Sequence, residues 1–217
     1  MKIVCLGDSL TEGDYGVYKK RCIANVHDEN YPYFLSKKLS AEVRNLGKCG
    51  CTPTSYLKFY NEGRFDFSDA ELYIIMLGTN GGLDAFSETQ CNEDYKKIIS
   101  LCRENSKDTP IVLCTPPHVT EDPEMSNYGF ANRVKDAVLF VKKIAAEQNL
   151  KLIDVASCDK FTAETEHIMQ PNDGNHGCSL WRRRKYCEKA FKAKRRLFIA
   201  AKDTQISKSL HNKSRYK

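Results

Sequence analysis

The chain has 217 residues, of which 41% are hydrophobic and 29% are charged, and this composition is typical of a folded protein rather than a disordered one. No segment is long and apolar enough to cross a bilayer, and only four apolar residues follow Lys2, so that neither a membrane span nor a signal peptide is expected. A cytoplasmic location is therefore expected, in which the ten cysteines are reduced thiols and not a disulfide framework.

The formal net charge of +6 is unevenly distributed along the chain. Residues 177–217 carry 14 Lys or Arg and 2 Asp or Glu, whereas residues 1–176 carry 20 Lys or Arg and 26 Asp or Glu. An interaction with an anionic partner can therefore rest only on the basic C-terminal segment, 177–217. The first part of the chain, 1–176, is long enough to form one domain with a sizeable core.

Short apolar segments alternate with helical patterns through this domain. The first predicted strand is 3–6, and Asn30 with Pro32 then predicts the start of a helix, because Asn is a good N-cap and Pro suits the first turn. A weaker strand is predicted at 42–46. The strongest strand is 72–77, which is apolar throughout, as expected of a central strand covered on both faces.

Asn92 is predicted to cap the next helix, since apolar residues follow it at helical spacing. A strand at 111–114, a long helix at 127–148 and a last strand at 151–155 complete the domain. The long helix is expected to bury one stripe of side chains, namely Phe130, Val134, Val138, Val141 and Ala145. Five strands with mostly helical crossovers predict an α/β fold: a three-layer α/β/α, doubly wound (flavodoxin-like) domain with a five-stranded parallel sheet.

Polar motifs follow several of the predicted strands. Gly-Asp-Ser-Leu at 7–10 comes directly after the first strand. Gly50 follows the second strand and Asn80 the third, whereas Asp173 and His176 come beyond the fifth. Because the active sites of doubly wound domains form outside the carboxyl ends of the strands, we expect these residues to converge at one edge of the sheet.

In this order the motifs resemble the four signature blocks of the SGNH, or GDSL, hydrolase family, and the resemblance covers residues 1–176. It implies an SGNH-hydrolase type of fold and a serine esterase that hydrolyses carboxylic esters through an acyl-enzyme, without a cofactor. It identifies Ser9 as the nucleophile, His176 as its base and Asp173 as the residue that orients the histidine. It also implies an oxyanion hole formed by the backbone N–H groups of Ser9 and Gly50 and by the side-chain amide of Asn80.

The chemistry of these residue types agrees with the resemblance. A serine hydroxyl needs a base within hydrogen-bond reach, and an imidazole that titrates near neutrality can accept the proton and return it. A nearby carboxylate can hold the required tautomer. Taken singly, Ser9 could be a helix cap, Gly50 a turn glycine and Asp173 part of an Asp-Gly turn, so that the prediction depends on the four blocks together.

Three further residues are expected to contact the substrate, namely Asp8, Tyr15 and His118. The segment 14–31 is expected to overhang the site, where it either meets an anionic or sugar-bearing substrate or forms a solvated loop. The family resemblance allows small or acylated substrates, which include acetylated sugars, short acyl esters, thioesters and lysophospholipids.

The basic segment departs from the family pattern, in which an amphipathic helix follows the histidine block. Here only a thin apolar stripe is present, interrupted by basic residues and formed by Leu180, Cys187, Phe191 and Phe198. One interpretation is a native extension that binds anionic polymers or membrane surfaces by charge. The other, which we favour, is an end translated from a shifted reading frame, because the expected helix is lost where the composition changes. Sequencing the end of the gene distinguishes the two.

Two other functions are alternatives: a catalytically impaired binding module for carbohydrate or lipid, and anionic-polymer binding through the basic segment. The intact serine, asparagine and histidine argue against the first, and specific nucleic-acid binding is not expected, because charge runs usually form solvated surfaces. The chain lacks G-x-S-x-G, G-x-x-x-x-G-K-[ST], G-x-G-x-x-G and H-E-x-x-H, which disfavours an α/β-hydrolase fold, nucleotide binding and a zinc protease of that type. No metal site and no cofactor are expected.

Overall fold

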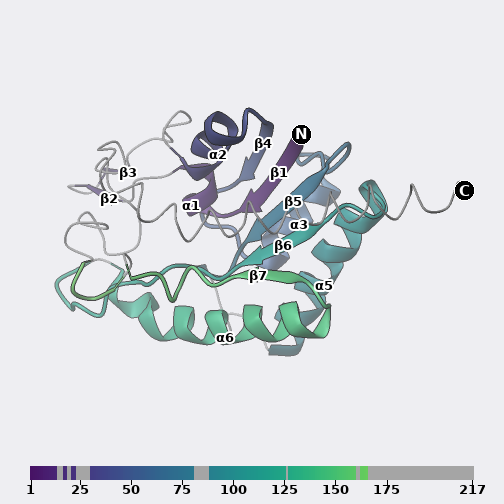
Figure 1. Ribbon diagram of the computed structural model, residues 1–217. Helices are drawn as coiled ribbons and strands as arrows, with labels where there is room; N and C mark the ends of the chain where they lie inside the picture. Colours follow the sequence, from purple (N-terminus) through teal and green to yellow (C-terminus); the bar gives the residue numbers. More distant parts are fainter. Residues whose placement is uncertain are drawn as a thin grey trace, which may run out of the picture.

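Five parallel strands form the central sheet of the protein (Figure 1). The computed structural model describes residues 1–13, 17–18, 21–22, 30–80, 88–125, 127–159 and 162–165. In the order in which they lie side by side, the strands are β4 (Glu42–Gly47), β1 (Lys2–Gly7), β5 (Leu72–Met76), β6 (Ile111–Cys114) and β7 (Lys151–Ile153). A separate antiparallel pair consists of β2 (Val17–Tyr18) and β3 (Arg21–Cys22). All five predicted strands of the main sheet are confirmed.

The order of the strands creates a topological switch point at the carboxyl ends of β1 and β5. From β1 the chain passes to β4 on one side, then crosses to β5 on the other side of β1 and continues outward to β6 and β7. This is the flavodoxin-like order, in which ligands bind in the crevice where the direction of winding reverses. The predicted fold class is confirmed.

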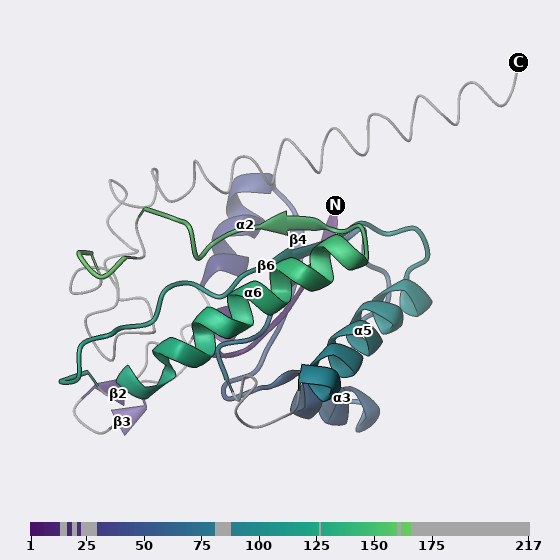
Figure 2. The same cartoon turned by 90° about the horizontal axis from the view of Figure 1, so that it is seen from below.

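Helices cover both faces of the sheet (Figure 2). On one face lies α2 (Tyr31–Leu39), and on the other lie α3 (Pro53–Asn61), α5 (Glu88–Asn105) and α6 (Ala131–Glu147). Leu35 of α2 belongs to the same core as Cys5 of β1, whereas Tyr56 of α3 belongs to the core that contains Leu6. Neighbouring residues of one strand thus enter different cores, as strand geometry requires. Within the described residues, no helix is both long and apolar enough to cross a membrane.

The helix α5 begins at Glu88, one turn earlier than predicted, so that Asn92 is not its N-cap. Cys91 is buried together with Tyr95, which shows that the apolar stripe extends upstream of the predicted cap. The buried Oδ1 of Asn92 accepts no hydrogen bond within the described part of the chain. The prediction was wrong because packing of the extra turn against the sheet outweighed the local preference of Asn for a cap.

The long helix α6 begins only after a short 3-10 turn, η1 (Tyr128–Phe130). Val134 and Val141 are buried as predicted, but Val138 is half-buried, and Phe140 is buried in the stripe instead. Residues spaced by four shift gradually around the helix, because one turn takes only about 3.6 residues. The predicted stripe therefore drifts away from the sheet at its middle.

The helix α3 is absent from the prediction, although its start carries a recognisable signal. The Thr52 hydroxyl accepts the Ser55 N–H at 3.1 Å, and the Ser55 hydroxyl accepts the Thr52 N–H at 2.8 Å. This is a capping box in which Ser replaces the usual Glu or Gln, and Pro53 occupies the first turn. The pattern Thr-Pro-x-Ser would have located the helix.

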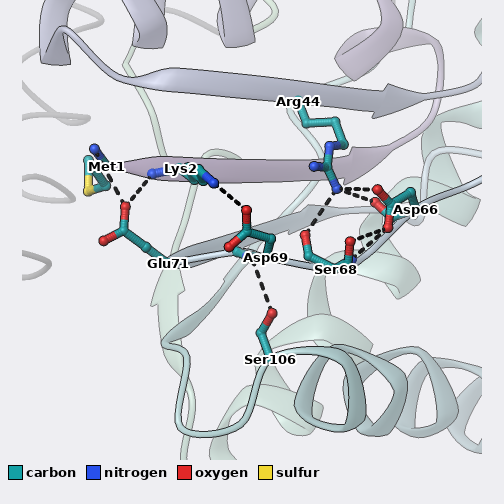
Figure 3. A network of polar contacts seen from close by, with 9 residues as sticks. Met1, Lys2, Arg44, Asp66, Ser68, Asp69, Glu71 and Ser106 are labelled. Carbon is teal, nitrogen blue, oxygen red and sulfur yellow. Dashed lines mark hydrogen bonds and ion pairs between the residues drawn. The ribbon is translucent and has the colours of Figure 1, made fainter.

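A network of ion pairs lies at the amino-terminal side of β1, β4 and β5, away from the switch point (Figure 3). Arg44 of β4 pairs with Asp66 at 2.9 Å. The Lys2 side chain pairs with Asp69, and the Lys2 N–H donates to Glu71 at 2.6 Å. Because these acidic side chains are well exposed, the pairs contribute little to stability. They hold the segment that leads into β5 beside the first strand.

Candidate active site

The predicted nucleophile, Ser9, is the first residue of α1 (Ser9–Glu12), the short helix that follows β1. Asp8 is the N-cap of this helix, since its Oδ1 accepts the Leu10 N–H at 3.0 Å. The interpretation of Ser9 as the helix cap is therefore wrong. Asp8 is fully buried and caps the helix that begins with Ser9. Contact between Asp8 and a substrate stays a prediction.

Two glycines allow α1 to lie against the end of the sheet. Gly7 ends β1, Gly47 ends β4, and the two are register partners. A Cβ atom on Gly7 would lie 1.9 Å from Thr11 Oγ1, and one on Gly47 would lie 2.1 Å from the backbone nitrogen of Glu12. No side chain can make such contacts, so that only glycine permits this close approach. Neither glycine was predicted to have this role.

The segment after β4 forms a tight turn around Gly50, a predicted oxyanion-hole residue. The Cys51 N–H donates to the Lys48 carbonyl at 3.1 Å, which closes a four-residue turn. Gly50 has a φ of +75°, whereas Cys49 before it is not among the residues with positive φ. This is a type II turn, whose third position favours glycine because that position requires a positive φ.

Gly50 is the one residue of this segment whose N–H has no acceptor among the described residues. The other N–H groups from 47 to 52 are occupied: Gly47 donates to Asn45 Oδ1, Lys48 to Gly7 O, Cys49 to Glu12 Oε2, Cys51 to Lys48 O and Thr52 to Ser55 Oγ. Gly50 is also exposed. An N–H without an acceptor on an exposed turn whose other donors are already bonded is well suited to bind an oxyanion.

Asn80, the predicted side-chain donor, follows β5 and adjoins the same turn. Its Nδ2 donates to the Cys51 carbonyl at 3.3 Å. A primary amide carries two N–H donors, and this is the only bond that Asn80 Nδ2 makes within the described residues, so that one donor is left for a ligand. Gly78, two residues before Asn80, has a φ of +130°, a conformation that favours glycine.

His118, a predicted substrate contact, lies half-buried in the loop that follows β6. The pKa of the Glu164 carboxyl is lowered first by hydrogen bonding to Thr162, and His118 contributes to the lowering. The pKa of Glu121 is lowered mainly by Lys135, and His118 contributes there too. Because His118 follows the carboxyl end of β6, it lies on the side of the sheet where the predicted site forms, and its contact with a substrate stays a prediction.

A second group of contacts, which was not predicted, joins the ends of β6 and β7. The Thr115 hydroxyl donates to Asp154 at 3.1 Å and accepts the Ala156 N–H at 2.9 Å, while Lys142 of α6 pairs with Asp154 at 2.7 Å. Partial burial acts to raise the pKa of Asp154, but the hydrogen bonds from Lys142 and Thr115 outweigh it and lower the pKa. These contacts fix the start of the chain that leads towards Asp173 and His176.

Hydrogen bonds therefore connect the first three sequence blocks at the switch point. The turn of Gly50 is bonded to α1 through Glu12 and to the end of β5 through Asn80. The predicted residues Asp173, His176 and Tyr15 lie outside the described residues. Within the described part, no group of three or more His, Cys, Asp or Glu residues could hold a metal ion.

Most of the chain matches one known protein family. Residues 5–177 match the GDSL-like Lipase/Acylhydrolase family, and the chain belongs to this family. The match ends one residue beyond the predicted domain boundary at 176, and the division of the chain at that point stays a prediction. No curated protein sequence matches the chain.

Solved structures of the same fold cover most of the chain. The lipase/acylhydrolase from Enterococcus faecalis is 21% identical, with a TM-score of 0.62 over 89% of this chain and 94% of its own. The native M. smegmatis aryl esterase is 18% identical, with a TM-score of 0.64 over 89% and 98%. A carbohydrate acetylesterase family member from Sinorhizobium meliloti is 20% identical, with a TM-score of 0.60 over 84% and 92%. At these identities the likeness shows the fold.

Proposed function

We propose that the protein is a serine ester hydrolase whose site lies at the switch point between β1 and β5. The observation that carries the proposal is the Gly50 N–H, which is left without an acceptor among the described residues in a turn bonded to both the Ser9 helix and Asn80. Acyl transfer requires hydrogen-bond donors beside the serine, because the tetrahedral intermediate develops a negative oxygen.

In the proposed reaction, Ser9 Oγ attacks the acyl carbon of the ester while His176 accepts the hydroxyl proton. Asp173 holds the imidazole in the tautomer that can accept it. The N–H groups of Ser9 and Gly50 and the amide of Asn80 bind the oxyanion. Collapse of the intermediate breaks the ester bond, and His176 returns the proton to the alcohol that leaves. Water then hydrolyses the acyl-enzyme by the same steps, and the acid is released.

The proposed substrates are carboxylic esters with a short acyl group, on a sugar or another small alcohol. The names of two proteins with this fold, an aryl esterase and a carbohydrate acetylesterase, support this range. The test is a set of 4-nitrophenyl acetate, butyrate, octanoate and laurate, together with an acetylated xyloside. We expect hydrolysis of the acetyl and butyryl esters and slower hydrolysis of the longer ones. A folded protein that cleaves none of them would contradict the proposal.

Replacement of Asn80 by alanine is expected to lower kcat for 4-nitrophenyl acetate by about 100- to 1,000-fold, with KM changed little. The reason is that the amide would bind the oxyanion of the transition state and not the uncharged ester. Asn61→Ala is the matched control, because Asn61 is an exposed residue at the end of α3, and it should leave kcat unchanged. Equal kcat values for Asn80→Ala and wild type would exclude Asn80 from the oxyanion hole.

A further inference from the structure

Glu12 is buried although it carries a carboxyl group, and the proposed reaction gives it no role. It is the last residue of α1, one helical turn after Ser9, and only 9% of its surface is exposed. Its Oε2 accepts the Cys49 N–H at 2.5 Å. The Glu12 side chain therefore reaches from the helix of the proposed nucleophile to the turn of Gly50.

The main chain at Glu12 is held from two other directions. The Asn30 amide donates to the Glu12 carbonyl at 3.0 Å, and the Asn45 amide donates to the Thr11 carbonyl at 2.9 Å. Gly47 of β4 packs against the Glu12 backbone. Because its backbone is fixed in this way and its side chain is buried, the carboxylate is a well-positioned acceptor for the turn.

The hydrogen bond from the Cys49 N–H to Glu12 restrains the orientation of the turn. Cys49 is the second residue of the type II turn and Gly50 the third, so that the Glu12 bond fixes the peptide plane directly before the one that carries the Gly50 N–H. Lys48 also faces Glu12, but at 3.7 Å and with a side chain that is 40% exposed. Solvent screens such a pair, so that the hydrogen bond to Cys49, more than this ion pair, is the contact by which the Glu12 side chain positions the turn.

We propose that Glu12 is a positioning residue for the oxyanion hole: by accepting the Cys49 N–H, it holds the turn of residues 48–51 against α1 so that the Gly50 N–H is directed at the reacting acyl oxygen. This inference rests on the proposed function. It predicts that loss of the acceptor affects the transition state and leaves ground-state binding of the ester almost unchanged.

Glu12→Ala is expected to lower kcat for 4-nitrophenyl acetate by about 10- to 100-fold, because a small displacement of an oxyanion donor is sufficient for such a loss. KM should change little. Inhibition by phenylboronic acid, which forms a tetrahedral adduct with a serine, should weaken by a similar factor. Glu12→Gln keeps an amide oxygen that can accept the Cys49 N–H and should recover most of the lost kcat. Glu62→Ala, at an exposed position after α3, is the control and should match wild type.

A second pair of variants tests the donor of the same hydrogen bond. Cys49→Pro removes the N–H but suits the second position of a type II turn, whereas Cys49→Ala keeps the N–H. We expect Cys49→Pro to lose kcat to the same extent as Glu12→Ala and to have about a tenth or less of the kcat of Cys49→Ala. In the double variant Glu12→Ala/Cys49→Pro, the losses should not add, because both changes break one bond.

The outcomes separate this inference from the proposed function. If wild type hydrolyses no ester, the proposed function is wrong. If wild type is active and Glu12→Ala keeps its kcat, or if boronate inhibition is unchanged while kcat falls, Glu12 does not position the oxyanion hole. Additive losses in the double variant would also overturn the inference. Should Glu12→Ala fail to fold, the comparison of Cys49→Pro with Cys49→Ala decides.

Discussion

Ser9→Ala is expected to lower kcat for 4-nitrophenyl acetate by about 10,000-fold or more, since the acyl-enzyme can no longer form. The residual rate would come from the oxyanion hole alone. A fluorophosphonate probe, which reacts with activated serines, should label wild type and leave Ser9→Ala unlabelled. Because the Ser9 side chain is small and is not the cap of α1, the variant should fold normally.

A matched control separates the loss of the nucleophile from the loss of any serine hydroxyl. Ser100 of α5 donates to the Lys96 carbonyl within its own helix, far along the sequence from the first block. Ser100→Ala should be labelled and should keep the wild-type kcat. Peptide mapping of the labelled wild type should locate the adduct at Ser9. An adduct on another serine, or undiminished turnover by Ser9→Ala, would refute the assignment of the nucleophile.

Gly47→Ala is expected to reduce the free energy of unfolding by about 3 kcal/mol or more, as overpacking against an immobile neighbour does. The new Cβ would lie 2.1 Å from the nitrogen and 2.6 Å from the Cα of Glu12. Both are backbone atoms, which cannot move aside as the end of a flexible side chain can, so that α1 must separate from β4. Urea denaturation measures the loss, and esterase activity should fall with it because α1 carries Ser9.

Gly129→Ala provides the control for this experiment. Among the described residues, no atom beyond the chain neighbours of Gly129 lies within 4 Å of a Cβ built on it, and its φ is not positive, so that the free energy of unfolding should change by no more than about 0.5 kcal/mol. Unfolding curves of Gly47→Ala and Gly129→Ala that coincide would show that α1 does not pack as closely on β4 as described.

The strands were predictable because a buried strand of a parallel sheet is apolar along its whole length, and β5 shows this pattern in full. Helix boundaries were less predictable. Asn92 has the chemistry of a cap, yet it lies inside α5, since burial of Cys91 extends the helix by one turn. A cap preference is worth about 1 kcal/mol, and tertiary packing of a further turn can exceed it.

The order of the sequence blocks determined the family and the candidate residues Ser9, Gly50 and Asn80. A local pattern could predict them because each follows a strand, and parallel strands bring their carboxyl ends to one edge. The chemistry of each residue type then supplied its expected role. These predictions did not depend on contacts between different segments of the chain.

Only the tertiary structure revealed that Gly47 must be glycine, that Glu12 accepts the Cys49 N–H and that the Gly50 N–H has no acceptor among the described residues. These facts depend on contacts between α1 and the end of β4, which are more than thirty residues apart in the chain. The register of β1 against β4, which pairs Gly7 with Gly47, sets those contacts. Hydropathy and the spacing of residue types describe one segment of the chain at a time. A hydrogen bond between two segments depends on how those segments pack against each other.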